Sequence, residues 1–315
     1  MSKLKDSLFY AKILLFGEYG IIEDSMGLSI PFNQFNGALK IDKSNTSFHT
    51  ESNKDIELFY QYLCELNKKN ELPCEFNLAQ FRTDINKGLY FDSSIPQGFG
   101  VGSSGALVAS VYNQYGINKI NISHEPNGDE ILKLKTIFSK LESYFHGKSS
   151  GLDPLICYLN LPVLIKSKTD LDTIQLPSPN ENGKGAIFLL NSGSPGQTQG
   201  MVSIFLEKLK NEGFRNLIKN QFKKHNDDCI DAFLRKDIQP LFTSLKKLSE
   251  LVYDNFSPMI PDQYKSIWKK GIESNSYYLK LCGSGGGGFI LGFTQNIDQA
   301  KSILKDQKLQ VIYQF

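Results

Sequence analysis

The stretch that decides the fold is residues 95–107, IPQGFGVGSSGAL, which places four glycines and two serines before an apolar run ending at Gly116. Glycine loses more backbone entropy on folding than any other residue, so this run must need a backbone without side chains. The N–H groups at the start of a helix point outward and carry partial positive charge, which favours a bound anion. We therefore predict a helix with Ser103 as its N-cap and Gly116 as its stop, and a phosphate at its start.

Two glycine runs, at residues 100–105 and 283–288, match the letters of the dinucleotide-binding fingerprint GxGxxG. The first comes late in the chain, and the second precedes an apolar strand rather than a helix, so neither has the context of that motif. The Walker pattern GxxxxGK[ST] is absent from the sequence. A flexible linker or a tight turn is the alternative for either run.

Composition excludes several classes of protein. The 315 residues carry a formal net charge of +2 with scattered lysines, which gives no electrostatic case for nucleic acid. No apolar stretch reaches the roughly 18 residues of a membrane helix, and Lys12 interrupts the first apolar run without a cleavage site after it. The five cysteines form no CxxC pair, which is typical of reduced thiols and predicts a cytoplasmic protein without disulfides or zinc.

The hydrophobic pattern predicts an α+β chain of two domains, 1–180 and 181–315, joined through the polar segment 167–185. Expected strands cover residues 8–16, 37–44 and, from an alternating pattern, 76–91; expected helices cover 54–67 and 129–145. Helices are predicted over 198–270. A strand, the second glycine run, a strand, a helix and a last strand end the chain.

Three charged residues stand out against these elements. Lys12 lies inside an apolar strand, where a buried ammonium is costly unless it is paired; a lysine at a strand edge with its head in water is the alternative. Glu142 falls on the predicted helix 129–145, and Asp153 follows soon after it. Two carboxylates near a phosphate loop can hold magnesium and accept a proton, although each alone could equally be a solvated or capping residue.

Four segments together resemble the motifs of the GHMP small-molecule kinases, most of all the mevalonate kinases. They are KILLFGE (12–18), PQGFGVGSSG (96–105), Glu142 with HGKSSGLD (146–153), and GSGGGG (283–288). Four motifs in the family's order are far more specific than any one, and they span nearly the whole chain. The resemblance implies an N-terminal domain like ribosomal protein S5 domain 2 and a ferredoxin-like C-terminal domain.

The same resemblance implies a site for ATP and Mg2+. Mg2+ would be held by Ser104, in preference to Ser103, and by Glu142. Asp153 would accept the proton of the attacking hydroxyl, and Lys12 would stabilise that carboxylate and the developing alkoxide. The expected nucleotide-binding residues are Pro96, Gly98, Gly100, Gly102, Ser103, Ser104 and Gly105.

The implied reaction is phosphorylation of mevalonate to 5-phosphomevalonate in isoprenoid precursor biosynthesis. Tyr19 stands where mevalonate kinases usually have histidine, so another GHMP kinase (phosphomevalonate, sugar or homoserine kinase) and a non-catalytic nucleotide-binding homologue are the alternatives. The expected partner is a small molecule, and a homodimer is left open. The substrate-side residues that the resemblance implies are Glu18, Tyr19, His146, Ser150, Gly283, Ser284 and Thr198.

Overall fold

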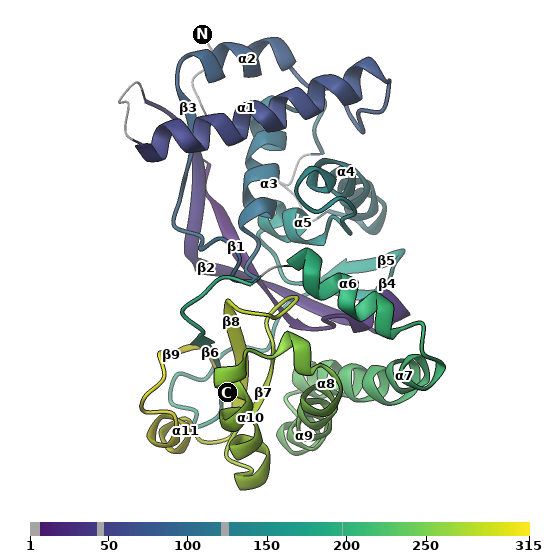
Figure 1. The fold of residues 1–315 in the computed structure, drawn as a ribbon, viewed down its shortest axis with the longest axis vertical. Helices are drawn as coiled ribbons and strands as arrows, with labels where there is room; N and C mark the ends of the chain where they lie inside the picture. The colour runs from purple at the N-terminus through teal and green to yellow at the C-terminus, as the bar shows by residue number, and fades with distance from the viewer. Residues whose placement is uncertain (1–6, 43–46, 121–125, 197) are drawn as a thin grey trace. The chain divides into compact units, whose positions relative to one another are not determined.

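The computed structural model describes residues 7–42, 47–120, 126–196 and 198–315, with the side chains of 47, 48, 198 and 199 outside that description (Figure 1). The chain divides into two compact units. Unit 1 contains the described residues up to Lys12 together with Ile30–Gln97 and Gly102–Leu161, and unit 2 contains Ile13–Ser29, Gly98–Val101 and Pro162–Phe315. The expected boundary between residues 180 and 181 stays a prediction.

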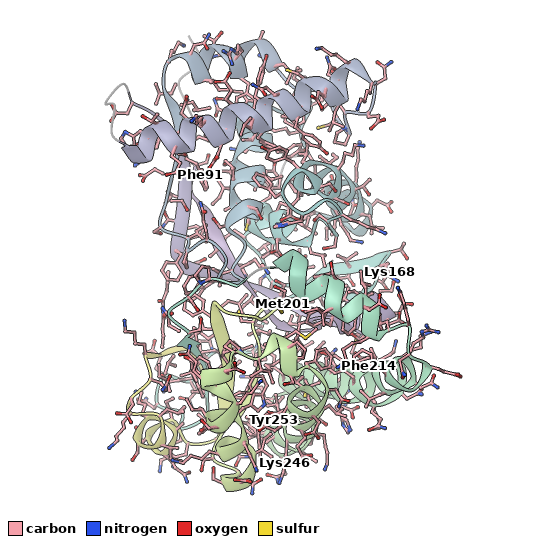
Figure 2. All side chains as sticks on the ribbon, viewed as in Figure 1. Phe91, Lys168, Met201, Phe214, Lys246 and Tyr253 are labelled. Atoms are coloured by element: carbon pink, nitrogen blue, oxygen red, sulfur yellow. The ribbon has the colours of Figure 1, made fainter. Side chains whose placement is uncertain are left out.

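Unit 1 combines antiparallel strands with packed helices. Residues 37–41 of β2 (Gly27–Ile41) pair with β3 (Leu89–Ser93), and the ring of Phe91, labelled in Figure 2, fills the space where Gly37 has no side chain. Helix α1 (Ser47–Lys68) packs on β3 and on α2 (Leu78–Asn86). Three further helices pack on one another, namely α3 (Ser103–Tyr115), α4 (Gly128–His146) and α5 (Leu152–Leu159).

The strand expected over 76–91 is wrong for most of its length. Residues 78–86 form α2, whose buried face carries Phe81 and Ile85 at helical spacing. The Asn77 side chain accepts a hydrogen bond from the backbone N–H of Gln80 at 3.0 Å and starts the helix. Only Leu89–Ser93, after the turn at Gly88, is the strand β3.

The N-cap of the helix after the first glycine run lies one residue earlier than predicted. Gly102, with φ of 80°, is the N-cap of α3, and Ser103 is the first helical residue. A left-handed backbone at the cap suits glycine because it has no Cβ, so the prediction of Ser103 as the cap is wrong. The predicted stop at Gly116 is confirmed. The predicted helix 129–145 is confirmed as α4, which a capping box between Asn127 and Glu130 begins.

Unit 2 contains the antiparallel sheet β7-β8-β6-β9. Its strands follow the β-α-β-β-α-β chain order of a ferredoxin-like domain, with several helices in the first helical place, which agrees with the predicted α+β class. The predicted strands and helix at the end of the chain are confirmed. The four strands are β6 (Ala186–Asn191), β7 (Tyr278–Leu281), β8 (Phe289–Thr294) and β9 (Leu309–Gln314).

Helices cover much of the rest of unit 2, as the sequence predicts for 198–270. Helices α8 and α9 lie side by side in Figure 1, and α9 and α10 both contact β7. The helices are α6 (Thr198–Lys208), α7 (Glu212–Leu217), α8 (Lys223–Arg235), α9 (Ile238–Asn255), α10 (Asp262–Ser274) and α11 (Ile297–Ile303), with short helical turns at Gly20–Glu23, Ile218–Phe222 and Ser257–Met259.

The predicted first strand is confirmed as β1 (Phe9–Phe16), which neighbours β2. In unit 2, residues 27–29 of β2 pair with β4 (Val163–Ser167), and β4 pairs with β5 (Asp170–Thr173). None of the helices in the described ranges is both long and apolar enough to cross a membrane.

Candidate functional site

In unit 1, strand β1 places Lys12 beside the carboxylate of Asp153. The Lys12 ammonium lies 2.8 Å from Asp153 Oδ1, and the two side chains are 4% and 38% exposed. Asp153 is the second residue of α5, where the helix dipole favours a negative charge. The lysine is therefore buried and paired, which excludes the alternative of a strand-edge lysine with its head in water.

Glu142 lies on the buried face of α4 and is held by two serines. Its Oε1 accepts a hydrogen bond from Ser104 Oγ at 3.4 Å, and its Oε2 accepts a short one from Ser149 Oγ. Burial, and then the negative charge of Asp153, raise the pKa of the Glu142 carboxyl to about 8. A cation beside this carboxylate would favour its charged form.

Ser104 connects Glu142 to His146. Ser104 Oγ lies 3.1 Å from His146 Nε2, and burial lowers the pKa of that imidazole. A neutral imidazole with its proton on Nε2 donates to Ser104 Oγ, whose own proton then goes to Glu142. That arrangement leaves one lone pair on Ser104 Oγ. We refer to Lys12, Ser104, Glu142, His146 and Asp153 as the Lys12–Asp153 cluster.

Two glycines let the start of α3 approach these residues closely. A Cβ on Gly105 would lie 2.8 Å from the carbonyl carbon of Asp153, and one on Gly102 would lie 3.0 Å from Lys12 Cγ. Contacts that short are closer than van der Waals packing allows. Beneath them, the buried Cys157 Sγ lies 3.7 Å from the Gly102 carbonyl oxygen. The N–H groups at the start of α3 are thus fixed beside the Lys12–Asp153 pair.

The donor set fits Mg2+. Ser104 Oγ and Glu142 Oε1 are hard oxygen donors that converge, and Mg2+ prefers oxygen and commonly takes one or two carboxylates together with phosphate and water. No group of three or more His, Cys, Asp or Glu side chains within the described residues could form an all-protein metal cage.

In unit 2, residues 98–100, 195–196 and 282–288 pack closely against one another, largely through main-chain atoms. A Cβ on Gly100 would lie 2.4 Å from the Cys282 carbonyl oxygen, and one on Gly288 would lie 2.5 Å from Phe99 Cα. The Gly196 N–H donates to the Gly98 carbonyl at 2.8 Å. Packing therefore explains part of the demand for glycine at 98–100 that the sequence attributed to an anion.

The second glycine run, residues 283–288, is held along its length. Gly283, Gly285, Gly286, Gly287 and Gly288 all have positive φ. The Gly286 N–H donates to the Met259 carbonyl at 2.6 Å, and the Gly288 N–H to the Ser194 carbonyl at 2.7 Å. A Cβ on Gly286 would meet the side chain of Met201, labelled in Figure 2, at 3.0 Å. The run is a packed turn, which excludes a flexible linker.

Glu18 and Tyr19 both contact the chain around this run. Lys280 Nζ, on β7, lies 2.6 Å from Glu18 Oε2, and both side chains are buried. Burial raises the pKa of the Glu18 carboxyl, and Lys280 opposes that effect. The Tyr19 hydroxyl donates to the Ser284 carbonyl at 2.6 Å, and burial raises the pKa of its phenol, which therefore stays a donor.

The remaining predicted residues have simpler surroundings. Ser150 is exposed, and its Oγ accepts the Leu152 N–H at 3.4 Å; Pro96 is half-buried. Ser103 is half-buried in the first turn of α3. Thr198 begins α6, and its side chain lies outside the described residues.

Sequence reasoning missed two residues, Ser149 and Lys280. Lys280 carries the signal that singled out Lys12, a lysine inside an apolar strand. Ser149 adjoins Ser150, and nothing in the sequence distinguishes the two.

Comparison with known families and structures identifies relatives of the fold. Residues 60–160 match the model of the GHMP kinases N terminal domain. No curated protein matches the sequence. The fold is similar to that of L. major mevalonate kinase in complex with R-mevalonate. The TM-score is 0.62 and the sequence identity 16%, and the match covers 97% of this chain and 93% of that chain.

Two solved kinases with other acceptors have equally similar folds. The Streptococcus pneumoniae phosphomevalonate kinase, in complex with phosphomevalonate and AMPPNP, gives TM-score 0.62 and 12% identity, covering 98% of each chain. The Lactococcus lactis galactokinase, complexed with galactose, gives TM-score 0.61 and 12% identity, covering 98% of this chain and 94% of that chain. At these identities the likeness concerns the fold and leaves the acceptor open.

Proposed function

We propose that the protein phosphorylates a small-molecule alcohol with ATP, and that the alcohol is mevalonate. The match of residues 60–160 to the GHMP kinases N terminal domain and the likeness of the fold to solved kinases of this family support the proposal. GHMP kinases are ATP-dependent small-molecule kinases. The observation that carries the proposal is the Lys12–Asp153 cluster, in which a paired base and a second carboxylate lie beside the start of α3.

In this proposal Asp153 accepts the proton of the acceptor hydroxyl while the hydroxyl oxygen attacks the γ-phosphorus of ATP; the bond from that phosphorus to the β–γ bridging oxygen breaks, and ADP leaves. An alcohol of pKa about 16 is a weak nucleophile, so a base within hydrogen-bond reach is needed. Lys12 pairs with Asp153 before the transfer and stabilises the negative charge that develops on the attacking oxygen. Lys12 itself is almost fully buried, so its charge is held in one place.

Ser104 and Glu142 are the residues that would hold Mg2+. The bound ion supplies neutralisation of the charge on the transferred phosphoryl group. Ser149 and His146 contact the two ligands: Ser149 donates a hydrogen bond to Glu142, and His146 contacts Ser104. Such supporting hydrogen bonds orient ligands and matter nearly as much as the ligands themselves.

The nucleotide is proposed to bind with its phosphates at the N-terminus of α3. That helix has 13 residues, and its first turn offers N–H groups without helical partners. Positive φ at Gly98, Gly100 and Gly102 gives the approach to the helix a backbone in which N–H groups can gather. The full nucleotide set in the proposal is Pro96, Gly98, Gly100, Gly102, Ser103, Ser104 and Gly105.

Mevalonate is proposed as the acceptor because the segment 146–153 offers few cationic side chains for an acceptor that already carries a phosphate. Phosphomevalonate would need additional Arg or Lys beside the cluster, whereas the segment 146–153 holds Lys148 on an exposed turn. His146, Ser150, Gly283, Ser284 and Thr198 are the residues proposed for the acceptor side. A non-catalytic nucleotide-binding protein is the second candidate, and the retention of Lys12, Glu142 and Asp153 in one packed cluster favours the enzyme over it.

A coupled assay of ADP release tests the proposal. The purified protein is incubated with ATP and Mg2+ and with mevalonate, phosphomevalonate, galactose or homoserine, and Asp153→Asn serves as the inactive reference. Release of ADP with mevalonate alone supports the proposed acceptor. Release with another alcohol changes the acceptor and keeps the kinase. If ATP binds and no alcohol raises ADP release above the Asp153→Asn level, the binding protein becomes the better reading.

A further inference from the structure

Two consecutive residues of unit 2, Glu18 and Tyr19, contact positions four residues apart on the chain that enters the second glycine run. Glu18 pairs with Lys280, two residues before Cys282, and Tyr19 donates to the carbonyl of Ser284. We propose that Glu18 and Tyr19 are positioning residues that fix the conformation of residues 283–288, Glu18 through Lys280 and Tyr19 through the Ser284 carbonyl.

The ion pair is enclosed on every side that the structure describes. The side chains of Lys280 and Glu18 are 1% and 2% exposed, and the Lys280 ammonium also lies 5.5 Å from the ring centre of Phe16. Glu18 Oε1 is buried and receives no hydrogen bond from the described residues. Such a pair adds little net stability over apolar residues of the same size, but removing one partner leaves a buried charge alone. The pair contributes to positioning instead, because it permits only one alignment of Glu18 with Lys280 on β7.

Tyr19 is held as firmly. It has φ of 61°, a left-handed backbone that a bulky side chain rarely adopts. The ring lies 4.5 Å from that of Phe205 and 5.6 Å from that of Phe256, centre to centre. A strained backbone persists only where the surroundings determine it. Here the ring contacts and the hydrogen bond to Ser284 determine it, so the hydroxyl is already in use within unit 2.

This assignment differs from the substrate role expected for the two residues from sequence. Glu18 Oε2 is paired with Lys280 and the Tyr19 hydroxyl donates to a backbone carbonyl, so each side chain already has a polar partner within unit 2. Their effect on an acceptor would pass through Gly283 and Ser284. That last step rests on the proposed kinase function; the effect on the run itself does not.

Amide hydrogen exchange on the full chain, without nucleotide or acceptor, tests the role of Tyr19. Tyr19→Phe removes the hydrogen bond and keeps the ring. Tyr277→Phe is the matched control, because its buried hydroxyl also donates to a backbone carbonyl, that of Ile267 at 2.9 Å, away from the run. We expect amides 283–287 to exchange about five- to tenfold faster in Tyr19→Phe, the effect of one ordinary hydrogen bond, and to be unchanged in Tyr277→Phe. Equal rates at these amides in wild type and Tyr19→Phe, or the same acceleration in both variants, would overturn the proposal.

A double-mutant cycle tests the ion pair. Glu18→Gln and Lys280→Met are each expected to lower the thermal midpoint and to accelerate exchange at 283–287. The double variant, which contains no lone buried charge, is expected to recover at least half of the loss in midpoint. Additive losses would show that the two side chains act independently and would remove Glu18 from the positioning role. If a single variant does not fold, the double variant and Tyr19→Phe still decide the matter.

Activity gives an independent arm. With a responsive acceptor, a positioning role predicts that Tyr19→Phe lowers kcat by about five- to tenfold, in step with the exchange rates. A rise in acceptor KM with unchanged exchange at 283–287 would instead make Tyr19 a substrate contact. If no acceptor responds at all, the kinase proposal fails. The exchange experiment still decides whether Glu18 and Tyr19 fix the conformation of residues 283–288.

Discussion

The ammonium of Lys12 and the carboxylate of Asp153 lie 2.8 Å apart, yet they differ in their access to solvent, at 4% and 38% exposure. A small molecule can therefore reach the Asp153 carboxylate, the proposed base, while the ammonium beside it stays buried in the protein. Because the ammonium is out of water, its field at Asp153 is less screened than that of a surface lysine. The pair thus provides a reachable proton acceptor next to a fixed positive charge.

Replacing Asp153, the proposed base, should slow the reaction strongly without weakening nucleotide binding. We expect Asp153→Asn to lower kcat by about 10²- to 10⁴-fold, the usual contribution of general base catalysis. Fluorescence titration should give a nucleotide Kd within about threefold of wild type, because the change keeps the shape of the side chain. Asp92→Asn breaks the exposed Lys40–Asp92 pair and should leave kcat unchanged. Near-normal turnover in Asp153→Asn would remove the residue from the role of base.

Removing the buried cation should affect the chemical step more than binding. Lys12→Met keeps most of the side-chain volume and is expected to lower kcat by about 10²-fold through lost stabilisation of developing charge. Asp153 is partly exposed, so it does not become a buried lone charge, and far-UV circular dichroism should show a folded protein. Lys40→Met, at the exposed pair, is the control. A kcat within twofold of wild type would contradict the assigned role.

A single methyl group at Gly105 should disturb the cluster. The Cβ of Gly105→Ala would lie 2.8 Å from both the Asp153 carbonyl carbon and the Pro154 nitrogen, so α3 and α5 must separate. We expect a loss of about 1–3 kcal/mol in the free energy of unfolding, together with reduced kcat. Gly128→Ala in the first turn of α4 meets nothing within 4 Å and should be neutral or stabilising. Urea unfolding of the two variants measures the difference, and equal midpoints would refute the close approach.

Glu142 should make the metal-free protein less stable as pH rises. Its folded pKa of about 8 is above its ordinary value of 4.5, so the folded state binds more protons in this window. The free energy of unfolding should therefore fall between about pH 5 and pH 8, by at most about 4 kcal/mol. Glu142→Gln cannot titrate and should flatten the curve. Thermal midpoints across this range, measured with EDTA, provide the check; parallel curves for the two proteins would count against the buried acid.

Two adjacent serines should differ in their effect on magnesium. Ser149 donates to Glu142, whereas Ser150 is exposed and accepts a backbone N–H. We expect Ser149→Ala to raise the half-saturating Mg2+ concentration by about tenfold, as for other residues that orient a metal ligand. Ser150→Ala should leave it unchanged. The readouts are the Mg2+ dependence of ADP release and direct titration of the Mg·nucleotide complex, and identical titrations for both variants would exclude Ser149 from this role.

Local patterns predict much of the fold because their causes are local. Helix α4 has an apolar face at helical spacing and its own caps, so its sequence alone determines where it begins and ends. Helix α2 is shorter, and its apolar residues suit an alternating strand nearly as well, which explains the wrong prediction there. The cap of α3 depends on the positive φ of Gly102, which a sequence does not display.

In the candidate site too, some features follow from local sequence patterns and others only from the fold. Lys12 stands out because a charge interrupts an apolar strand, and the structure supplies the partner that such a charge needs. Lys280 interrupts a later strand in the same way, but its partner Glu18 is 262 residues away in sequence. Pairings across such separations come from the fold. Serines 149 and 150 are alike in sequence, and only their surroundings separate them.

The backbone packing in unit 2 has a consequence for how this chain can evolve. A Cβ on Gly100 would face the carbonyl of Cys282, and one on Gly196 would face the carbonyl of Gly285. Gly292, by contrast, faces the side chain of Phe188, where a smaller neighbour could make room for a methyl group. A main-chain atom is identical whichever amino acid carries it. No second substitution in the opposing segment can therefore compensate for a side chain at Gly100 or Gly196, and these positions have no route by which they could covary.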